Sequence, residues 1–184
     1  MCSRFQSVRL DSDLRFFFQA QWRQPPGELK QDVFPGYTAP FVRRPPELAS
    51  GDEAVPAREA VAGSFGLLPH WAKDAKLAKS TYNARSETVA SKPAFRDPLG
   101  IAGLWSRWKP PRGLEVLSFT MLTINADTHP VMCNYHRPDD VKRMIVLLRE
   151  EDFDAWLDAP PERSMEFMRA CAPEELVAIS ELRP

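Results

Sequence analysis

The chain has 184 residues, of which 43% are hydrophobic and 27% charged, and its formal net charge is −1. These values are typical of one soluble globular domain, and a net charge near zero argues against indiscriminate binding to nucleic acid. No apolar run approaches the ~20 residues needed to cross a bilayer. The polar start "SRFQSVRLDSD" lacks the pattern of a signal peptide. We therefore expect a cytoplasmic protein with no membrane partner.

The first part of the chain predicts one helix followed by irregular structure. "LDSDLRFFFQAQW" (10–22) begins with Asp and Ser and groups its apolar residues, which predicts a helix. Residues 25–58 are rich in proline and glycine, which favours surface loops, turns and at most edge strands. Residues 59–72 predict a strand that ends at Pro69, and "KDAKLAKS" (73–80) predicts a short helix.

The rest of the chain predicts a sheet with helices at its margins. Apolar runs at 99–108 and 114–124 predict two strands, joined by "KPPRG" as a hairpin turn. Three kinds of element are predicted further on: a strand at the end of 139–148, amphipathic helices at 150–160 and 161–173, and a closing strand at 175–184. Together these elements predict a single α+β domain over 1–184 with a mostly antiparallel sheet.

The three cysteines are odd in number and form no C-x-x-C pattern, so the sequence predicts no metal site, no disulfide framework and no cofactor. We expect Cys133 and Cys171 to be reduced, small and buried. Cys2 differs, because removal of Met1 leaves an α-amine and a thiol two carbons apart. Such a 1,2-aminothiol condenses with an aldehyde to a thiazolidine. The alternative is a chance residue at a frayed terminus.

Two further motifs contain candidate site residues. In "NARSET", Asn83, Arg85 and Glu87 alternate, so an extended chain places them on one face, either as a binding site or as a surface salt-bridge ladder. In "MCNYHRPDD", His136 precedes an arginine and could serve as a neutral base or hydrogen-bond donor at pH 7, or fill a structural role. His70 and His129 carry weaker signals.

Charge is distributed unevenly along the chain. Residues 1–120 contain 17 Lys and Arg against 12 Asp and Glu, whereas 121–184 contain 7 against 13. A basic face opposite an acidic one is compatible with a phosphate-bearing partner.

The motifs follow an order that resembles a known family. "MCSRF", "FGLLPHWAKD", "YNARSETV", "GLW" with "SFTMLT", "NADTHPVMCNYHRP" and "MIVLL" succeed one another between residue 2 and about 158. This is similar to the SRAP family, the SOS-response-associated peptidase-like proteins. The resemblance implies a barrel-like sheet core and binding to single-stranded DNA that contains abasic sites, as a monomer without a cofactor. It also implies a role in the SOS response and DNA repair, in a bacterial cytoplasm, with nucleoid association when DNA is bound.

The resemblance also implies roles for individual residues. The amine of Cys2 would attack the C1′ aldehyde of a ring-opened abasic site, and its thiol would then close the thiazolidine. Asn83 would hold the cysteine or the sugar, and His136 would assist ring opening by proton transfer. The residues implied in DNA binding are Arg4 and Arg85, for flanking phosphates, and Trp71, for bases.

The sequence departs from the family pattern near the site. "AFRDPLGIAGLW" leaves no room between Arg96 and Leu99 for a family segment that supplies a glutamate near the cysteine, and Glu87 is a doubtful substitute. Either the protein lacks this segment or the two sides are not contiguous in the natural chain. The family has His, one residue, then Arg-Met-Pro, whereas six residues separate His136 from Arg143-Met144 here. The C-terminus is also shorter than the family pattern.

Three functions stay open on these residues. The first is an enzyme that forms DNA–protein crosslinks at abasic sites. The second is a cysteine peptidase or amidase with Cys2 as N-terminal nucleophile, and the third is a non-catalytic module that binds single-stranded DNA.

Overall fold

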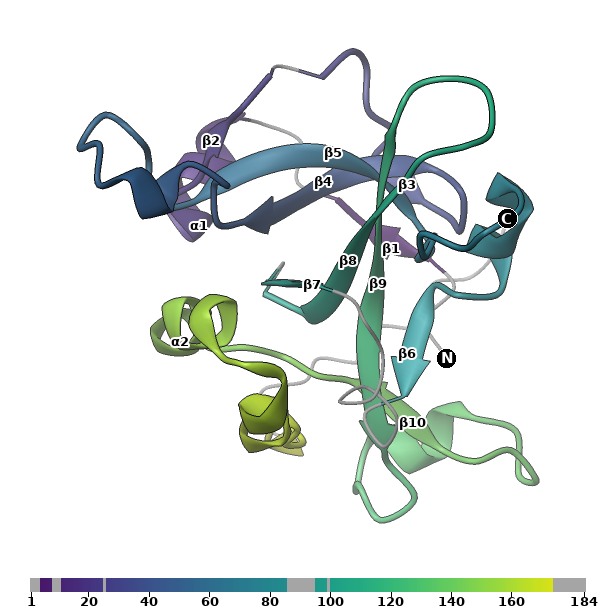
Figure 1. Ribbon diagram of the computed structural model, residues 1–184. Helices are drawn as coiled ribbons and strands as arrows, with labels where there is room; N and C mark the ends of the chain where they lie inside the picture. Colours follow the sequence, from purple (N-terminus) through teal and green to yellow (C-terminus); the bar gives the residue numbers. More distant parts are fainter. Residues whose placement is uncertain (1–3, 8–10, 25, 86–94, 99, 174–184) are drawn as a thin grey trace.

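A computed structural model describes residues 4–7, 11–24, 26–85, 95–98 and 100–173, with the backbone only at 50, 84–85 and 95–98 (Figure 1). The described elements are, in chain order, β1 (Phe5–Gln6), α1 (Asp11–Phe18), β2 (Gln21–Trp22), β3 (Asp32–Val33), β4 (Thr38–Arg43), η1 (Leu48–Ser50), β5 (Glu59–Phe65), η2 (Ala75–Lys79), β6 (Asn83–Arg85), β7 (Phe95–Pro98), β8 (Ala102–Trp108), β9 (Val116–Asn125), η4 (Met132–Tyr135), β10 (Arg143–Ile145), η5 (Glu150–Asp152), α2 (Phe153–Asp158) and η6 (Pro161–Phe167), where η denotes a 3₁₀ helix.

β9 is the central strand of the sheet. Along one of its edges, β8 pairs with its first part and β10 with its last part, both antiparallel. Along the other edge, β5 and then β6 pair with it in parallel. Residues 118–124 of β9 are buried, as expected for a run of apolar and β-branched residues covered on both faces. Figure 1 shows β9 extending from the β4–β5 layer to β10.

The sheet is open among the described strands. Its order is β2-β5-β9-β8-β7, with β4 added to β5 and with β6 and β10 added to β9, while β1 and β3 form a separate two-stranded sheet. Five of the eight described pairings are antiparallel. The protein is therefore a mixed α/β fold with a sheet-dominated core and few helices, and closure into a barrel is not found in the part of the chain that the structure describes.

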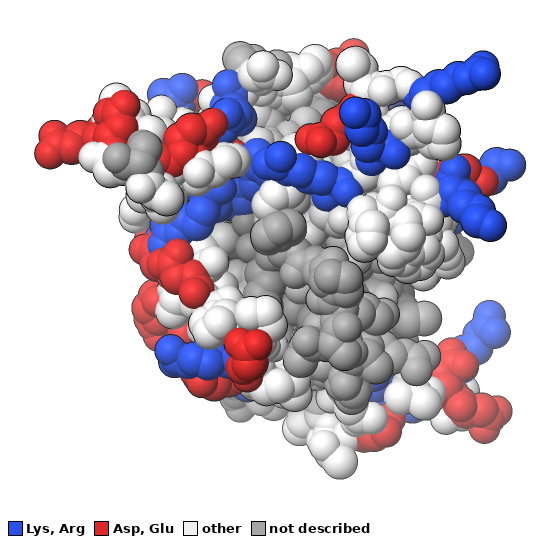
Figure 2. All heavy atoms as spheres, viewed as in Figure 1, with Lys and Arg blue, Asp and Glu red and all other residues white. Residues whose placement is uncertain are grey.

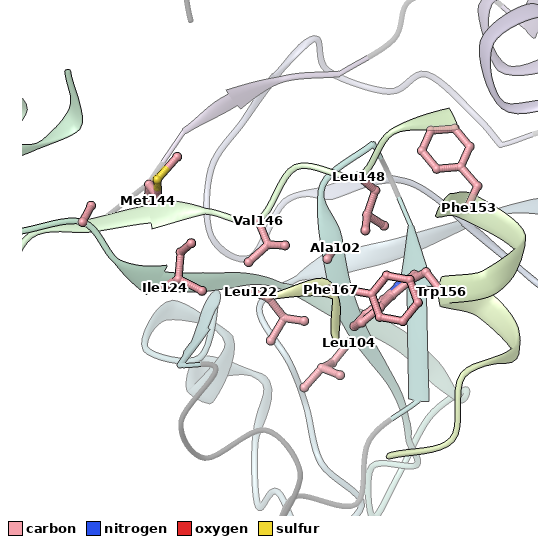
Figure 3. Packing of buried hydrophobic residues seen from close by; sticks show 11 residues of the cluster. Ala102, Leu104, Leu122, Ile124, Met144, Val146, Leu148, Phe153, Trp156 and Phe167 are labelled. Carbon is pink, nitrogen blue, oxygen red and sulfur yellow. The ribbon is translucent and has the colours of Figure 1, made fainter. Parts of the chain in front are cut away.

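Alternating side chains of β9 supply two separate hydrophobic cores. Leu122 packs with β8, β10 and α2 in one core, where the rings of Trp156 and Phe167 lie 5.3 Å apart (Figure 3). Phe119 and Met121 point to the opposite face and pack with β1, β4 and β5. Asn83, one of the candidate functional residues, pairs with Met121 and so lies on this second face.

Two predicted boundaries move because single residues adopt positive φ. The helix predicted over 10–22 ends at Phe18, since Gln19 has a φ of 50° and turns the chain toward β2. The strand predicted to reach Pro69 ends at Phe65, since Gly66 has a φ of 118°.

The prediction of at most edge strands within residues 25–58 is confirmed at β4, but the expected surface exposure is wrong there. Five of its six residues are buried, although β4 pairs only with β5 among the described strands and so tolerates Pro40 as an edge strand does. The helices predicted at 73–80 and 161–173 are the shorter 3₁₀ helices η2 and η6. The strand predicted at 175–184 lies outside the described residues.

Two arginines connect the β4–β5 layer to α2. Arg58 donates from Nε to Oδ1 of Asp154 at 3.0 Å, and its Nη2 lies 2.9 Å from Oδ2. Arg44 donates to both carboxylate oxygens of Asp158, at 2.9 and 2.7 Å. The hydrogen bond from Arg58, with attraction from Arg44, holds the pKa of Asp154 below its ordinary value against the opposing effect of burial.

Gly66→Ala should destabilise the fold strongly. A Cβ at this position would overlap the carbonyl group of Ala78 in η2, and a positive φ adds a cost of roughly 1–2 kcal/mol for an L-residue. We expect the melting temperature to fall by about 10 °C, on the scale of ~2–4 °C per kcal/mol. Gly51→Ala is the matched control, because Gly51 also has positive φ but meets nothing within 4 Å. Equal shifts for the two variants would contradict the clash.

Asp154→Asn should reduce stability at pH 7 more than at pH 3. Because the folded-state pKa lies below the ordinary value, the carboxylate stabilises the fold above that ordinary value and ceases to do so as pH falls through the folded pKa. Urea unfolding at both pH values measures the gap between parent and variant. Asp139→Asn, at an exposed position of the loop 137–142, is the control. A gap of the same size at both pH values would disprove the assignment.

Candidate functional site

Cys2 and Glu87 lie outside the described residues, so the N-terminal side of the site is described from Arg4 onward. Nε and Nη2 of Arg4 donate to Oδ1 of Asp32 at 3.0 and 2.7 Å, and both side chains are about half exposed, at 47% and 48%. The pair lies on the β1–β3 ladder, in which Gln6 pairs with Asp32. Arg4 is thus an accessible cation two residues from Cys2 in the sequence.

An aromatic cluster connects β1 to the start of β6. The ring of Phe5 meets Phe65 edge-on with centroids 5.1 Å apart, and Phe65 contacts Tyr82 at 5.8 Å. Tyr82 directly precedes Asn83, the first residue of β6. The fold therefore brings the strand that follows Cys2 and the strand that carries Asn83 to the same side of β9.

Asn83 and Arg85 share one face of the sheet, as their spacing predicts. In the parallel β6–β9 ladder, Asn83 pairs with Met121 and Arg85 with Thr123, and paired positions point to the same face. The Oδ1 atom of Asn83 is buried, although the residue as a whole is partly exposed. The functional roles of both residues stay predictions.

His136 is half-buried and is held by two backbone groups. Its Nδ1 lies 3.1 Å from the carbonyl oxygen of Met132, and the backbone N–H of Arg143 donates to its Nε2 at 3.2 Å. Since an N–H can only donate, Nε2 accepts and Nδ1 carries the proton. These bonds select the Nδ1–H tautomer of the neutral ring.

The six residues between His136 and Arg143 fold into a compact loop. Nζ of Lys142 donates to the carbonyl oxygens of Arg137 and Pro138, which ties the end of the loop to its start. The loop thereby returns the chain to His136, so the histidine and the Arg-Met pair are adjacent in space despite their separation in the sequence.

Arg143 is a buried arginine on the same face. Its Nε donates to Oγ1 of Thr123 at 2.9 Å and its Nη2 to the carbonyl oxygen of Thr123 at 2.6 Å, and the residue is only 7% exposed. Thr123 is also the residue that pairs with Arg85. Arg143 was not among the residues predicted to have a role. Its position beside Met144, which matches the Arg-Met of the family pattern, is the sequence feature that could have indicated one.

Trp71 lies on an exposed, lysine-rich segment. Its side chain is 62% exposed, and the next residue is anchored because Nε1 of Trp108 donates to the carbonyl oxygen of Ala72 at 2.6 Å. Asp74 caps η2 by accepting from the backbone N–H of Lys76. The exposed lysines of this segment are Lys73, Lys76 and Lys79. An exposed indole beside cations is the composition that binds single-stranded nucleic acid.

Positive and negative side chains are unevenly distributed over the face seen in Figure 2. Figure 2 shows Lys and Arg side chains most densely over the upper half of the face in view, whereas much of the Asp and Glu lies along its left and lower margins. Asn83 and Arg143 pair with β9 from opposite edges, His136 accepts a hydrogen bond from the backbone of Arg143, and Trp71 lies on the segment that leads into β6.

The remaining histidines and cysteines are not connected to the candidate site by any contact described above. His129 is buried, its Nε2 meets the carbonyl oxygen of Cys171 at 3.0 Å, and its Nδ1 accepts from two backbone N–H groups. His70 is exposed. Cys133 and Cys171 are reduced cysteines that are partly exposed, so the prediction that both are buried is wrong.

The described ranges contain neither a metal-binding cluster nor a membrane-spanning helix. Within them, no group of three or more His, Cys, Asp and Glu side chains could hold a metal ion. No helix in these same ranges combines the length and the apolar character needed to span a membrane.

Comparison with solved structures identifies relatives of the fold. A protein from Bordetella bronchiseptica is 30% identical with a TM-score of 0.78, and the alignment covers 98% of this chain and 100% of the other. A protein from Bacteroides thetaiotaomicron has a TM-score of 0.63 over 90% of this chain and 84% of its own, with 18% identity, and shares the fold.

Comparison with curated proteins identifies the abasic site processing proteins YoqW and YoaM of Bacillus subtilis. YoqW is 29% identical over 130 residues, covering 51% of this chain and 55% of YoqW. YoaM is 28% identical over 142 residues, covering 58% and 59%. The chain thus spans a little over half the length of these relatives.

The model of the family "SOS response associated peptidase (SRAP)" matches residues 1–100 and 96–181. The two matches meet where the sequence predicts a missing segment, and there β7 and β8 form a tight hairpin with Pro98 opposite Ala102. Together the matches cover nearly the whole chain. The chain therefore belongs to the SRAP family.

Proposed function

We propose that this chain recognises abasic sites in single-stranded DNA and links itself covalently to them through Cys2. The observation that carries the proposal is the family match, which begins at residue 1 and so includes Cys2. The names of the relatives YoqW and YoaM, abasic site processing proteins, support the lesion as substrate. The ring contacts that connect β1 to the start of β6, and the pairing of both β6 and β10 with β9, support a common site for Arg4, Asn83 and His136.

The proposed reaction needs no oxidant, reductant or cofactor. An abasic site exposes an aldehyde at C1′ when its sugar ring opens. The α-amine of Cys2 adds to this carbon and expels water as a Schiff base forms. The thiol then adds to the C=N carbon, its proton passes to the nitrogen, and a thiazolidine results. Ordinary pKa values of about 7.7–8.0 for the amine and 8.5 for the thiol leave reactive fractions of both near neutrality.

Asn83 and His136 are proposed to position the sugar. The amide of Asn83 offers both a donor and an acceptor at the sheet face. His136 is proposed to act on the ring oxygen of the deoxyribose. In the structure both of its nitrogens bond to the backbone, so proton transfer from this ring requires one of these bonds to open when DNA binds.

Arg4, Arg85 and Trp71 are proposed to contact the DNA. Arg4 is accessible beside β1, and its planar guanidinium suits a phosphate. Arg85 is proposed as a second phosphate contact from its position next to Thr123. Trp71 and the neighbouring lysines are proposed to bind bases and backbone of the same strand.

Cys2→Ala should abolish the covalent adduct. The purified chain, mixed with an oligonucleotide that bears one abasic site, should give a heat-stable band on a denaturing gel, because a thiazolidine persists where a Schiff base hydrolyses. Cys133→Ala and Cys171→Ala are matched controls and should keep the full yield. Undiminished adduct from Cys2→Ala would refute the proposal.

The alternatives predict other results in this assay. A non-catalytic module would bind abasic and intact strands alike, with strong dependence on salt and no adduct from the parent chain. A peptidase would cleave peptide substrates through Cys2 without reacting with the oligonucleotide.

Asn83→Ala should slow adduct formation by about tenfold or more at saturating DNA, because loss of a hydrogen bond in the transition state costs ~1–3 kcal/mol. Affinity for DNA should change less than about twofold. Single-turnover crosslinking separates the two quantities, and Asn134→Ala, at an exposed position, is the control. A variant with the parental rate would exclude Asn83 from the site.

A further inference from the structure

A proline–glycine turn holds two aromatic rings side by side next to the N-terminal strand. The backbone N–H of Tyr37 donates to the carbonyl oxygen of Phe34 at 2.9 Å, which closes a four-residue turn. Gly36 has a φ of 89°, and Pro35 precedes it, so the residues match a type II turn with Pro and Gly at its central positions. The turn brings its first and last residues together, here Phe34 and Tyr37.

The two rings form an exposed surface with a cation beside it. Their centroids are 5.6 Å apart in edge-to-face geometry, and the residues are 41% and 39% exposed. Nζ of Lys30 lies 4.7 Å from the centre of the Tyr37 ring. The turn is anchored to the sheet, because the N–H of Gly36 donates to the carbonyl oxygen of Phe65 and the N–H of Phe65 donates to that of Tyr37. The rings are therefore preorganised and only partly covered.

This pair lies beside the strand that carries Arg4. Phe34 directly follows Val33, and Arg4 directly precedes Phe5, and Val33 and Phe5 are partners in the β1–β3 ladder. The Arg4–Asp32 ion pair occupies the same ladder. A strand of DNA that contacts Arg4 would therefore pass the two rings.

We propose that Phe34 and Tyr37 form a stacking platform for an unpaired nucleobase next to the abasic site, with Lys30 at the adjoining phosphate. The inference rests on the proposed function and adds a second base-binding surface to that of Trp71. Two half-exposed rings are too small a patch for a stable protein interface, which needs about 800 Å² per partner. Rings flanked by cations match what a base and its phosphate require.

The test uses a single strand with a tetrahydrofuran abasic analogue, which cannot crosslink, and with fluorescent 2-aminopurine immediately 5′ or 3′ of it. The parent chain should quench the fluorescence from one of the two positions. Phe34→Ala and Tyr37→Ala should remove this quenching and weaken binding by about five- to a hundredfold, the range for loss of one base–aromatic stack. Tyr37→Phe should retain both. Replacement of the adjacent base by an abasic spacer should erase the difference between parent and variants.

Phe16→Ala and Phe17→Ala provide a matched control. Phe16 and Phe17 are a second exposed edge-to-face pair, 5.1 Å apart on α1, and removal of either ring should change neither binding nor quenching. Thermal melts verify that each variant folds. Parental binding and quenching in the Phe34 and Tyr37 variants would overturn the platform, as would an equal loss in the Phe16 and Phe17 variants. The proposed function is judged separately, by whether the parent chain forms an adduct with a true abasic site.

Discussion

The site is organised by β9, whose two edges are hydrogen-bonded along most of its length. In a paired strand, each side chain points to one fixed face of the sheet. The register of a neighbouring strand therefore determines which of its side chains point to the same face. Asn83 pairs with Met121, and the chain around Arg143 pairs with Asn125, from opposite edges of the same strand. A slip of one residue in either ladder would turn these side chains into the opposite core. The packing of Leu122 and Trp156 on that other face therefore maintains the site as well as the fold.

The histidine loop shows how residues separated in the sequence can still make a local contact. Six residues separate His136 from Arg143, yet the N–H of Arg143 donates to the imidazole. Lys142 makes this possible, because its ammonium group binds two carbonyl oxygens at the beginning of the loop. The backbone bonds at both nitrogens fix the orientation of the ring before any ligand arrives, and one of them would have to open before the ring could take part in the proposed proton transfer.

Surfaces for DNA are proposed at two places, on the lysine-rich segment of Trp71 and at the turn of Phe34 and Tyr37. Both combine exposed rings with nearby lysines, and both are anchored to the sheet by backbone or indole hydrogen bonds. An aromatic ring can stack on any base, so two such surfaces would bind single-stranded DNA without a preference for base sequence. Specificity for the lesion then has to come from the aldehyde chemistry of Cys2.

Local chemistry along the sequence was enough to predict much of this protein. The second-position cysteine, the alternation of Asn83 with Arg85 and the strands around "KPPRG" depend on neighbours in the chain, and the strand pairing at β6 and at the "KPPRG" hairpin was confirmed. Tertiary structure decided the rest, since those features depend on residues far apart in sequence. The buried strand β4 within a proline-rich stretch, the return of Arg143 to His136 and the pairing of the N-terminal strand with Asp32 and Val33 all form only when distant segments pack together. The composition of a segment indicates which local structures it can form by itself. Burial and hydrogen bonds to residues far away in the sequence determine which of these structures it adopts in the fold.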